Sequence, residues 1–232
     1  MILPNLALKL VTAPVNQPVS LVDAKDFLRV TTSDDDALIT SLIDAATRKS
    51  ENYNNRFYIT QTWDVWIDHV PLIEGDSRDF GRGNDWWDGT RDGPVSGLRR
   101  EPDFFSMPRG QVQSITEFNS YNLEGTPSVF TGFDLDDATE AARLFLKNGQ
   151  FWPTDLRDRN AIQITTVYGY GDNGSDVPSD IQTAIKIILF GLYENRGCDD
   201  CSGAQYAPNG KASSMNSNAA CLLDPYTIER LE

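Results

Sequence analysis

The stretch DDDALITSLIDAATRKSENY, residues 34–53, decides the fold because it predicts a long amphipathic helix. Its apolar side chains recur at helical spacing in two adjacent rows, so they form one broad stripe along the helix. Ser33 is a typical N-cap, and the aspartates at 34–36 lie in the first turn, where the helix dipole favours carboxylates. Asn54 and Asn55 tolerate a left-handed conformation and are expected to end the helix.

Two further segments predict helices that pack with this one. Ser20 caps a helix expected over residues 21–28, with Asp23 in the capping-box position. Residues 179–196 predict a second long helix whose apolar side chains cover more than half of its circumference. Such a helix is buried on two sides, and we expect it to pack against a sheet and against the helix of residues 34–53. Together the three segments predict a small helical bundle core.

Between the helices the sequence changes to the period of β-strands. Residues 61–70 alternate, with Trp63, Val65 and Ile67 on one side, and residues 161–168 alternate in the same way. Further strands are expected at residues 6–11, 104–107, 112–121, 129–135 and 144–146. The expected fold class is therefore α+β, with an antiparallel β-rich elaboration over about residues 60–168 attached to the helical core.

Residues 74–103 form the longest stretch without a sustained period. They are rich in Gly, Asp and Arg and predict a long loop insertion. The adjacent Trp86 and Trp87 are candidate partner-binding residues, because tryptophan anchors interfaces well. The alternative is that these side chains fold the loop back on its own domain.

The C-terminal part of the chain predicts an arm. Residues 198–220 are small and polar, which is typical of a flexible segment. An apolar cluster follows, formed by Leu222, Leu223, Pro225 and Tyr226. An apolar cluster beyond a flexible spacer is suited to binding a neighbouring chain, and packing on its own domain is the alternative. We therefore expect residues 1–197 to form the main domain and residues 198–232 an extended arm with these four partner-binding residues.

Composition limits the possible functions. The 232-residue chain has a formal net charge of −14, and such a surface repels nucleic-acid phosphates. This argues against a DNA-binding module but is compatible with a surface past which DNA slides. No apolar run is long enough to span a bilayer, and residues 1–11 lack the basic leader of a signal peptide, so we expect no membrane association. Cys198, Cys201 and Cys221 leave an odd thiol, which indicates synthesis in a reducing cytoplasm and leaves their redox state open.

Catalytic and cofactor motifs are weak. The single histidine, His69, has no nearby nucleophile in the sequence. A G-x-G-x-x-G match at residues 169–174 is separated from the following helix by residues 176–178, and the alternating parallel strand–helix pattern of dinucleotide-binding folds is missing. The cysteines and His69 do not form the two close pairs typical of structural zinc. We therefore expect no enzyme, no cofactor and no metal site.

Several landmarks together resemble the tailed-phage head–tail connector (adaptor) family, the small neck proteins below the portal. Each landmark is a helix cap, a strand or a turn, and their order along nearly the whole chain carries the resemblance. They are LKLVTAP at 8–14, VSLVDAKDFLRV at 19–30, DDALI at 35–39, residues 45–53, TQTW at 60–63, residues 108–115, WP at 152–153, VYGYG at 167–171, VP at 177–178, YENR at 193–196 and LLDPY at 222–226. The insertion at 74–103 departs from the family's pattern.

The resemblance implies a structural role without catalysis. Many copies are expected to form a portal-bound ring, a dodecamer in related connectors, in the neck of the virion after synthesis in the host cytoplasm. The implied partners are the portal protein, neighbouring copies, and tail or stopper proteins, with capsid or a spike as partners of the 74–103 loop. DNA is expected to pass through the lumen without specific binding during genome ejection. C-terminal segments of such proteins commonly reach a neighbour or the portal, which agrees with the role inferred for residues 222–226.

Two other functions remain as alternatives. A stopper or tail-completion protein of the phage neck would share the scaffold and differ in its partner, so portal binding separates the two. A carbohydrate-binding module would use Trp66, Trp86 and Trp87 as stacking platforms. Such modules are mostly all-β, and the two strong helices count against this reading; glycan binding that is lost in Trp86→Ala and Trp87→Ala variants would support it.

Overall fold

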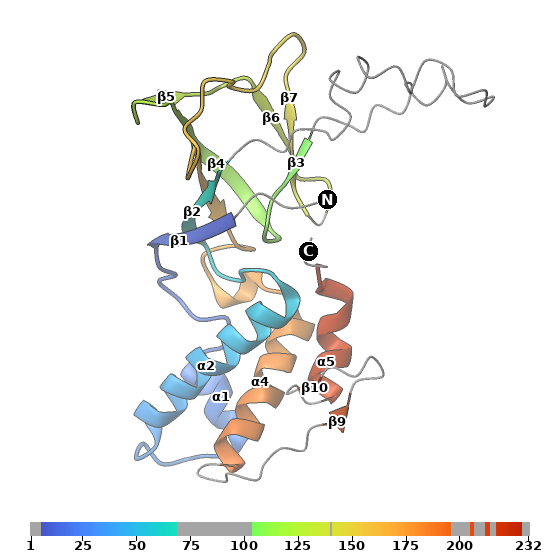
Figure 1. The fold of residues 1–232 in the computed structure, drawn as a ribbon. Coiled ribbons are helices and arrows are strands. Elements are labelled where there is room, and N and C mark those ends of the chain that lie inside the picture. Colours follow the sequence, from blue (N-terminus) through green and yellow to red (C-terminus); the bar gives the residue numbers. More distant parts are fainter. Residues whose placement is uncertain are drawn as a thin grey trace, which may run out of the picture.

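The computed structural model describes residues 6–68, 104–139, 141–195, 205–206, 212–213 and 217–228. In this part of the chain a layered β part lies at one end of a group of helices, and the two are joined at a narrow junction (Figure 1). The predicted α+β class is confirmed, and the strands of each sheet are antiparallel.

Four α-helices lie in the described residues: α1 (Leu21–Leu28), α2 (Asp36–Asn54), α4 (Ser179–Glu194) and α5 (Ser217–Leu223). The predicted cap of α1 is confirmed, because the Ser20 hydroxyl accepts a bond from the Asp23 N–H at 3.1 Å. Ser33 does not cap α2 as predicted. Its carbonyl accepts the Asp36 N–H in a turn, so the helix begins after Asp35. Asn55 ends α2 in the left-handed conformation, with φ 55°, as the sequence predicts.

The helices bury a common apolar core. Ile39 and Ile43 of α2 are buried against Ile181, Ile185 and Leu189 of α4. The prediction that α4 is buried on two sides is confirmed, but its second side packs against α5 and α1 instead of a sheet. The sheet lies beyond the end of α4, and the C-terminal helix occupies the position beside it (Figure 1).

Two sheets form the β part. A five-stranded sheet has the order β1 (Leu6–Thr12), β2 (Gln61–Ile67), β8 (Ile162–Tyr168), β4 (Val112–Tyr121), β5 (Pro127–Val129). A three-stranded sheet has the order β3 (Phe104–Ser106), β7 (Arg143–Leu146), β6 (Phe133–Asp136). The strand expected at 129–135 is thus divided between two sheets. A short pair, β9 (Gln205–Tyr206) and β10 (Ala212–Ser213), and two 3₁₀ turns, η1 (Gly174–Asp176) and η2 (Asp224–Tyr226), complete the elements.

A second apolar core fills the space between the two sheets. It contains the predicted inward residues Val65 and Ile67 of β2, together with Ile162 and Ile164 of β8. Phe118 of β4 lies at its centre. Three aromatic rings pack around Phe118, those of Phe130, Phe133 and Trp152, with ring centroids 5.2–6.1 Å away.

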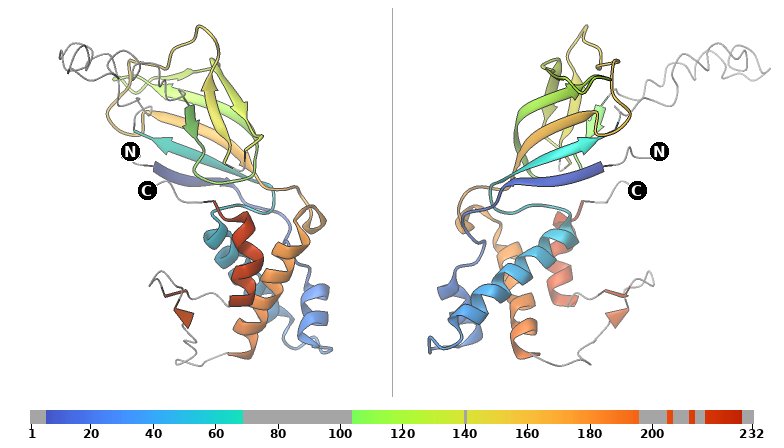
Figure 2. Two further views of the ribbon diagram at one scale, coloured as in Figure 1. Left: turned by 90° about the vertical axis from the view of Figure 1, so that its right-hand side faces the viewer. Right: turned by 60° about the vertical axis from the view of Figure 1, so that its left-hand side comes forward.

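The two cores meet at the segment between α2 and β2. Phe57 is buried in the core between the sheets, while the next two residues, Tyr58 and Ile59, are buried in the helical core. Three connections cross this junction: β1 to α1, α2 to β2, and β8 to α4 (Figure 2). Backbone bonds link the last two, since Tyr170 N donates to Tyr58 O and Thr60 N donates to Gly171 O. Three crossings, two of them bonded to each other, hold the sheets against the helices.

Candidate partner-binding site at the C-terminal segment

The predicted partner-binding residues near the C-terminus lie on α5 and η2. The structure packs these elements against the helices of the same chain, where the sequence analysis expects an extended arm. Ala219 and Leu223 are fully buried in the helical core. They are four residues apart and therefore lie on one side of a helix, and that side contacts α4. A seven-residue helix shows too few apolar repeats for this side to be recognised from sequence.

The four predicted residues differ in exposure. Leu223 is 0% exposed, so in this conformation it belongs to its own chain's core. Leu222 and Tyr226 are half-buried, and Pro225 is exposed. Partner binding stays a prediction for Leu222, Pro225 and Tyr226. Part of the surface of each of these side chains is exposed in the structure.

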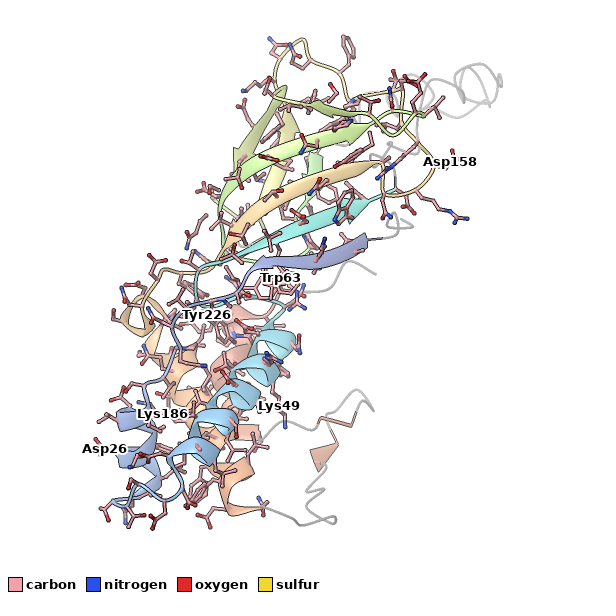
Figure 3. All side chains as sticks on the ribbon, turned by 90° about the vertical axis from the view of Figure 1, so that its left-hand side faces the viewer. Asp26, Lys49, Trp63, Asp158, Lys186 and Tyr226 are labelled. Carbon is pink, nitrogen blue, oxygen red and sulfur yellow. The ribbon has the colours of Figure 1, made fainter. Side chains whose placement is uncertain are left out.

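Polar contacts attach η2 to the C-terminal end of α2. The Tyr53 hydroxyl donates to the Asp224 carboxylate at 2.6 Å. Arg56 is only 4% exposed, and its Nε donates to the Tyr226 carbonyl. Ile228 N donates to the Asn54 carbonyl at 3.0 Å. Figure 3 shows Tyr226 beside the junction between helices and sheet. These bonds hold the chain end where the helical core meets the β part.

Two tyrosines of this site remain hydrogen-bond donors over a wide pH range. Burial, the bond to Asp224 and the charge of Asp224 raise the pKa of Tyr53 to about 12. Burial and the nearby Asp180 also raise the pKa of Tyr226, whose hydroxyl lies 3.3 Å from the Asp180 carboxylate. Ionisation of either hydroxyl would place two negative charges side by side, so both contacts persist at neutral pH.

The last turn of α2 also contacts the β part. The Glu51 carboxylate accepts the Tyr58 N–H at 3.0 Å and lies 3.4 Å from Gln61 Nε2. Burial is the largest influence and raises the pKa of Glu51 to about 7, although these hydrogen bonds and Arg109 act in the opposite direction. Arg109 donates to the Glu51 backbone carbonyl at 3.3 Å. One helical turn therefore connects the helices, the sheets and the C-terminal segment.

Tyr58, in the segment between α2 and β2, is buried against this turn. Its hydroxyl lies 2.7 Å from the Ser50 hydroxyl and accepts the Asn54 side-chain N–H at 3.0 Å. The sequence analysis predicts Asn54 only as a helix end. It does not predict that Tyr53, Arg56 and Asp224 hold the C-terminal segment in place. Their partners lie about 170 residues away along the chain, so no local pattern could have indicated these contacts.

The Tyr53→Phe variant is expected to loosen the C-terminal segment. It removes a hydrogen bond to a carboxylate, a contact worth about 1–2 kcal/mol, so amides of residues 217–228 should exchange about tenfold faster. Native-state hydrogen exchange measures this. Tyr121→Phe, which removes the hydroxyl bonded to Gln163 in the sheet, is the matched control and should leave exchange at 217–228 unchanged. Equal exchange in Tyr53→Phe and the parent protein would contradict a holding role for Tyr53.

Other predicted features are placed as follows. Trp86, Trp87 and the rest of the 74–103 insertion lie outside the described residues, as do His69, Cys198 and Cys201. Cys221 is an exposed free thiol on α5. In the described ranges no group of three or more His, Cys, Asp or Glu side chains could hold a metal ion. Among the helices that the structure describes, none is long and apolar enough to span a membrane.

The G-x-G-x-x-G match has a structural explanation. Gly169 has φ +124°, and a Cβ there would lie 2.6 Å from the backbone of Ile59 and Thr60. A Cβ at Gly174 would lie 2.7 Å from the Pro18 carbonyl oxygen. The glycines therefore allow the connection from β8 to α4 to cross close to its neighbours at the junction.

Comparison with known proteins gives one family match. Residues 18–70 match the family described as phage gp6-like head–tail connector protein. The matched region runs from the start of α1 through α2 and the junction to the end of β2. The resemblance indicated by the ordered sequence landmarks is thereby confirmed. No curated protein matches the chain.

Solved structures match over almost the whole length. A chain from the neck of an empty GTA particle, computed with C6 symmetry, has a TM-score of 0.67 at 20% identity. A chain from the virion of a native gene transfer agent (GTA) particle has a TM-score of 0.65 at 18% identity, and one from the neck of a native GTA particle, computed with C12 symmetry, has 0.63 at 18%. Each comparison covers 97% of both chains. The three chains therefore share this fold.

Proposed function

We propose that this protein is a structural head–tail connector, an adaptor in the neck of a tailed phage or phage-like particle. Many copies form a ring that joins the DNA-filled head to the tail and lets DNA pass. The main support for this proposal is the match of residues 18–70 to the head–tail connector family. The full-length similarity in fold to chains from GTA particles supports the same role for the rest of the chain.

The same comparisons support a ring, and its number of copies and its partners are part of the proposal. The similar neck structures were computed with sixfold and twelvefold symmetry, which supports a cyclic assembly and agrees with a dodecamer. Within the proposal, the portal protein binds one end of the ring and tail or stopper proteins bind the other. The four described helices act as the bundle core of the connector.

The C-terminal segment acts as the arm of this connector. The exposed sides of Leu222, Pro225 and Tyr226 contact the portal or the adjacent copy, while Leu223 keeps the segment attached to its own helices. Trp86 and Trp87 of the 74–103 insertion contact capsid, tail or a spike at the periphery of the ring. Deleting the insertion is then expected to reduce the yield of infectious particles, and normal yield would contradict this contact.

The acidic composition supports a conduit for DNA. With a net charge of −14 the chain attracts few phosphates, so a DNA molecule in the lumen slides without being retained. A lumen rich in lysine and arginine would bind DNA through counterion release and slow its passage. No catalytic step is part of the proposal.

Imaging by cryo-electron microscopy after mixing with the cognate portal ring tests the proposal. We expect a symmetric collar seated on the portal. The Leu222→Ser variant should weaken collar formation, because it removes apolar surface from the half-buried contact residue. Val22→Ser, which changes an exposed apolar residue on α1, is the matched control and should form the collar normally. Free portal rings beside unbound protein would overturn portal binding and favour the stopper or tail-completion role.

A further inference from the structure

Arg56 is a buried arginine in the segment between α2 and β2, where the two apolar cores meet. It is 4% exposed. A guanidinium is rarely buried unless its N–H groups are bonded, because it loses its hydration. Its Nε donates to the Tyr226 carbonyl, and its Nη1 lies 3.4 Å from the Tyr170 hydroxyl. One side chain therefore joins the C-terminal segment to the connection between β8 and α4.

The backbone at Arg56 is bonded to the β part. Arg56 forms an isolated parallel bridge with Gly110 in the turn between β3 and β4, where Gly110 N donates to Asn55 O at 3.1 Å. The Asn55 side chain donates to the Pro108 carbonyl of the same turn at 2.9 Å. These bonds fix the backbone from which the Arg56 side chain reaches the C-terminal segment. The position of that segment is therefore tied to the position of the β part.

Asn54, the last residue of α2, provides a second link. Its carbonyl accepts the Ile228 N–H at 3.0 Å, and its side-chain oxygen lies 3.4 Å from the Thr227 hydroxyl. Its side-chain N–H donates to the hydroxyl of Tyr58, whose carbonyl accepts the Tyr170 N–H at 2.9 Å. The C-terminal segment is therefore bonded at two points to the chain that leads from α2 into the β part.

Packing of the segment on the helices does not require these bonds. α5 is attached to the helical core through the buried Ala219 and Leu223. The bonds to Asn54 and Arg56 come from residues after α5, and the end of α5 that continues into η2 is the end nearer the β part (Figure 1). The segment thus has two separate attachments, an apolar one within the helices and a polar one at the junction.

η2 also spans the two helix ends that face the β part. The end of α2 leads into β2, and the connection from β8 leads into the start of α4. On α2, the Tyr53 hydroxyl donates to the Asp224 carboxylate at 2.6 Å. On α4, the Asp180 carboxylate lies 3.3 Å from the Tyr226 hydroxyl. One short segment therefore bridges the helix ends through which the helices are joined to the sheets.

We infer that residues 224–228 fix the orientation of the β part relative to the helices, with Arg56 as the residue that couples the two. Parts joined at a narrow junction move relative to each other unless contacts restrain them. Bonds to both helix ends and to Arg56 supply that restraint. For the assembled ring the inference rests on the proposed connector function, in which a partner contacts the exposed sides of Pro225 and Tyr226. Partner binding there narrows the range of orientations of the β part in the ring.

Hydrogen exchange in the isolated chain tests the link from the segment to the junction. Tyr53→Phe weakens the attachment of η2 to α2. The N–H groups of Thr60, Gly110 and Tyr170 are bonded across the junction, and we expect them to exchange about threefold faster or more in this variant. Faster exchange at residues 217–228 with unchanged exchange of these three amides overturns the inference.

Tyr193→Phe is the matched control for this experiment. It removes a hydroxyl bond of the same length, 2.6 Å, to the Asp35 carboxylate at the other end of the helices. It should leave the three junction amides unchanged. An equal effect of Tyr53→Phe and Tyr193→Phe on these amides also overturns the inference, because the junction would then respond to any loss of stability in the helical core.

A distance measurement tests Arg56 itself. Spin labels at Ser41→Cys in α2 and Ser114→Cys in β4, both exposed positions, report the distance between the helices and the β part by pulsed electron paramagnetic resonance, with the native cysteines replaced by serine. Arg56→Lys keeps the charge but loses the planar fork that reaches two acceptors. We expect the distance distribution to become about twofold broader or more. A distribution as narrow as that of the parent overturns the coupling through Arg56.

Arg157→Lys is the control for the distance measurement. Arg157 also donates to a backbone carbonyl, that of Asn160, in the loop that contains Asp158, away from the junction (Figure 3). This variant should keep the narrow distribution. Both tests use the isolated chain, so a ring that forms while both tests fail leaves the connector function standing. Absence of any ring, with or without portal, contradicts the connector function and changes neither test.

Discussion

Replacing Gly169 with alanine is expected to lower the free energy of unfolding by about 3 kcal/mol or more, because two penalties act together. Gly169 has φ +124°, a backbone conformation that residues with a Cβ rarely adopt. The added Cβ would also lie 2.6 Å from the Ile59 carbonyl carbon and the Thr60 nitrogen. These are backbone atoms at the junction, so they cannot move aside as a flexible side chain would. Urea denaturation measures the loss.

Gly191→Ala is the matched control for this experiment. Gly191 lies inside α4, and a Cβ there meets no atom within 4 Å. Alanine has the higher helix propensity, so this substitution is expected to raise the free energy of unfolding by about 0.5–1 kcal/mol. If Gly169→Ala lowers the free energy of unfolding while Gly191→Ala raises it, the loss in Gly169→Ala comes from the position of this glycine at the junction. A Gly169→Ala variant as stable as the parent would show that the crossing of the β8–α4 connection over residues 59–60 is not tight.

The sequence predicted a helix or strand best where its buried side chains recur at the spacing of that helix or strand and face a single core. α2 begins within two residues of its predicted start, because its apolar stripe is long and faces one core. β2 is recognised for a similar reason, since Val65 and Ile67 face the core between the sheets. In both elements the periodicity of the side chains reports directly on the surface that becomes buried.

The position of the C-terminal segment could not be predicted in the same way. Its composition is small and polar up to residue 220, which is typical of a flexible arm, and the two residues that anchor it, Ala219 and Leu223, are a single helical repeat. The contacts that hold it, from Tyr53 and Arg56, join residues far apart in sequence. Only the folded helices bring these groups together, so composition alone favoured the extended form.

The sequence analysis did not predict the junction, because side chains facing the helical core and side chains facing the core between the sheets follow each other directly there. Phe57 faces the core between the sheets and Tyr58 faces the helical core, a pattern that alternates between two cores instead of between core and solvent. In a sequence such a run appears uniformly apolar and gives no sign of the boundary. The same boundary explains the glycines at 169 and 174, whose G-x-G-x-x-G spacing the sequence analysis did not accept as a dinucleotide-binding motif.

The Glu51→Gln variant is expected to remove a pH-dependent loss of stability from the same junction. Burial raises the pKa of Glu51 from 4.5 to about 7, so between these values the folded protein binds more protons than the unfolded chain. The contribution of Glu51 to stability is therefore fully present below pH 4.5 and decreases as the pH rises through 7. Above this range a buried carboxylate is ionised, which costs on the order of 1–3 kcal/mol relative to its neutral form.

Glutamine keeps the shape of the neutral carboxyl and its acceptor oxygen. In the variant the amide oxygen still accepts the Tyr58 N–H, and no charge forms at any pH. At pH 8 the variant should exceed the parent in free energy of unfolding by about 1–3 kcal/mol, and near pH 4.5 the two should be almost equal. Denaturant unfolding at a series of pH values gives the difference, in which groups that titrate equally in both proteins cancel.

Glu124→Gln supplies the control, because it makes the same chemical change at an exposed residue in the turn between β4 and β5. Its unfolding free energy should follow that of the parent across the whole pH range. The free energies of unfolding of Glu51→Gln and the parent could instead differ by the same amount at every pH. This result would mean that Arg109 compensates the charge of Glu51 fully in the folded state. A difference that grows from pH 5 to pH 8 would show that ionisation of one carboxylate at the end of α2 weakens the attachment of the helices to the sheets.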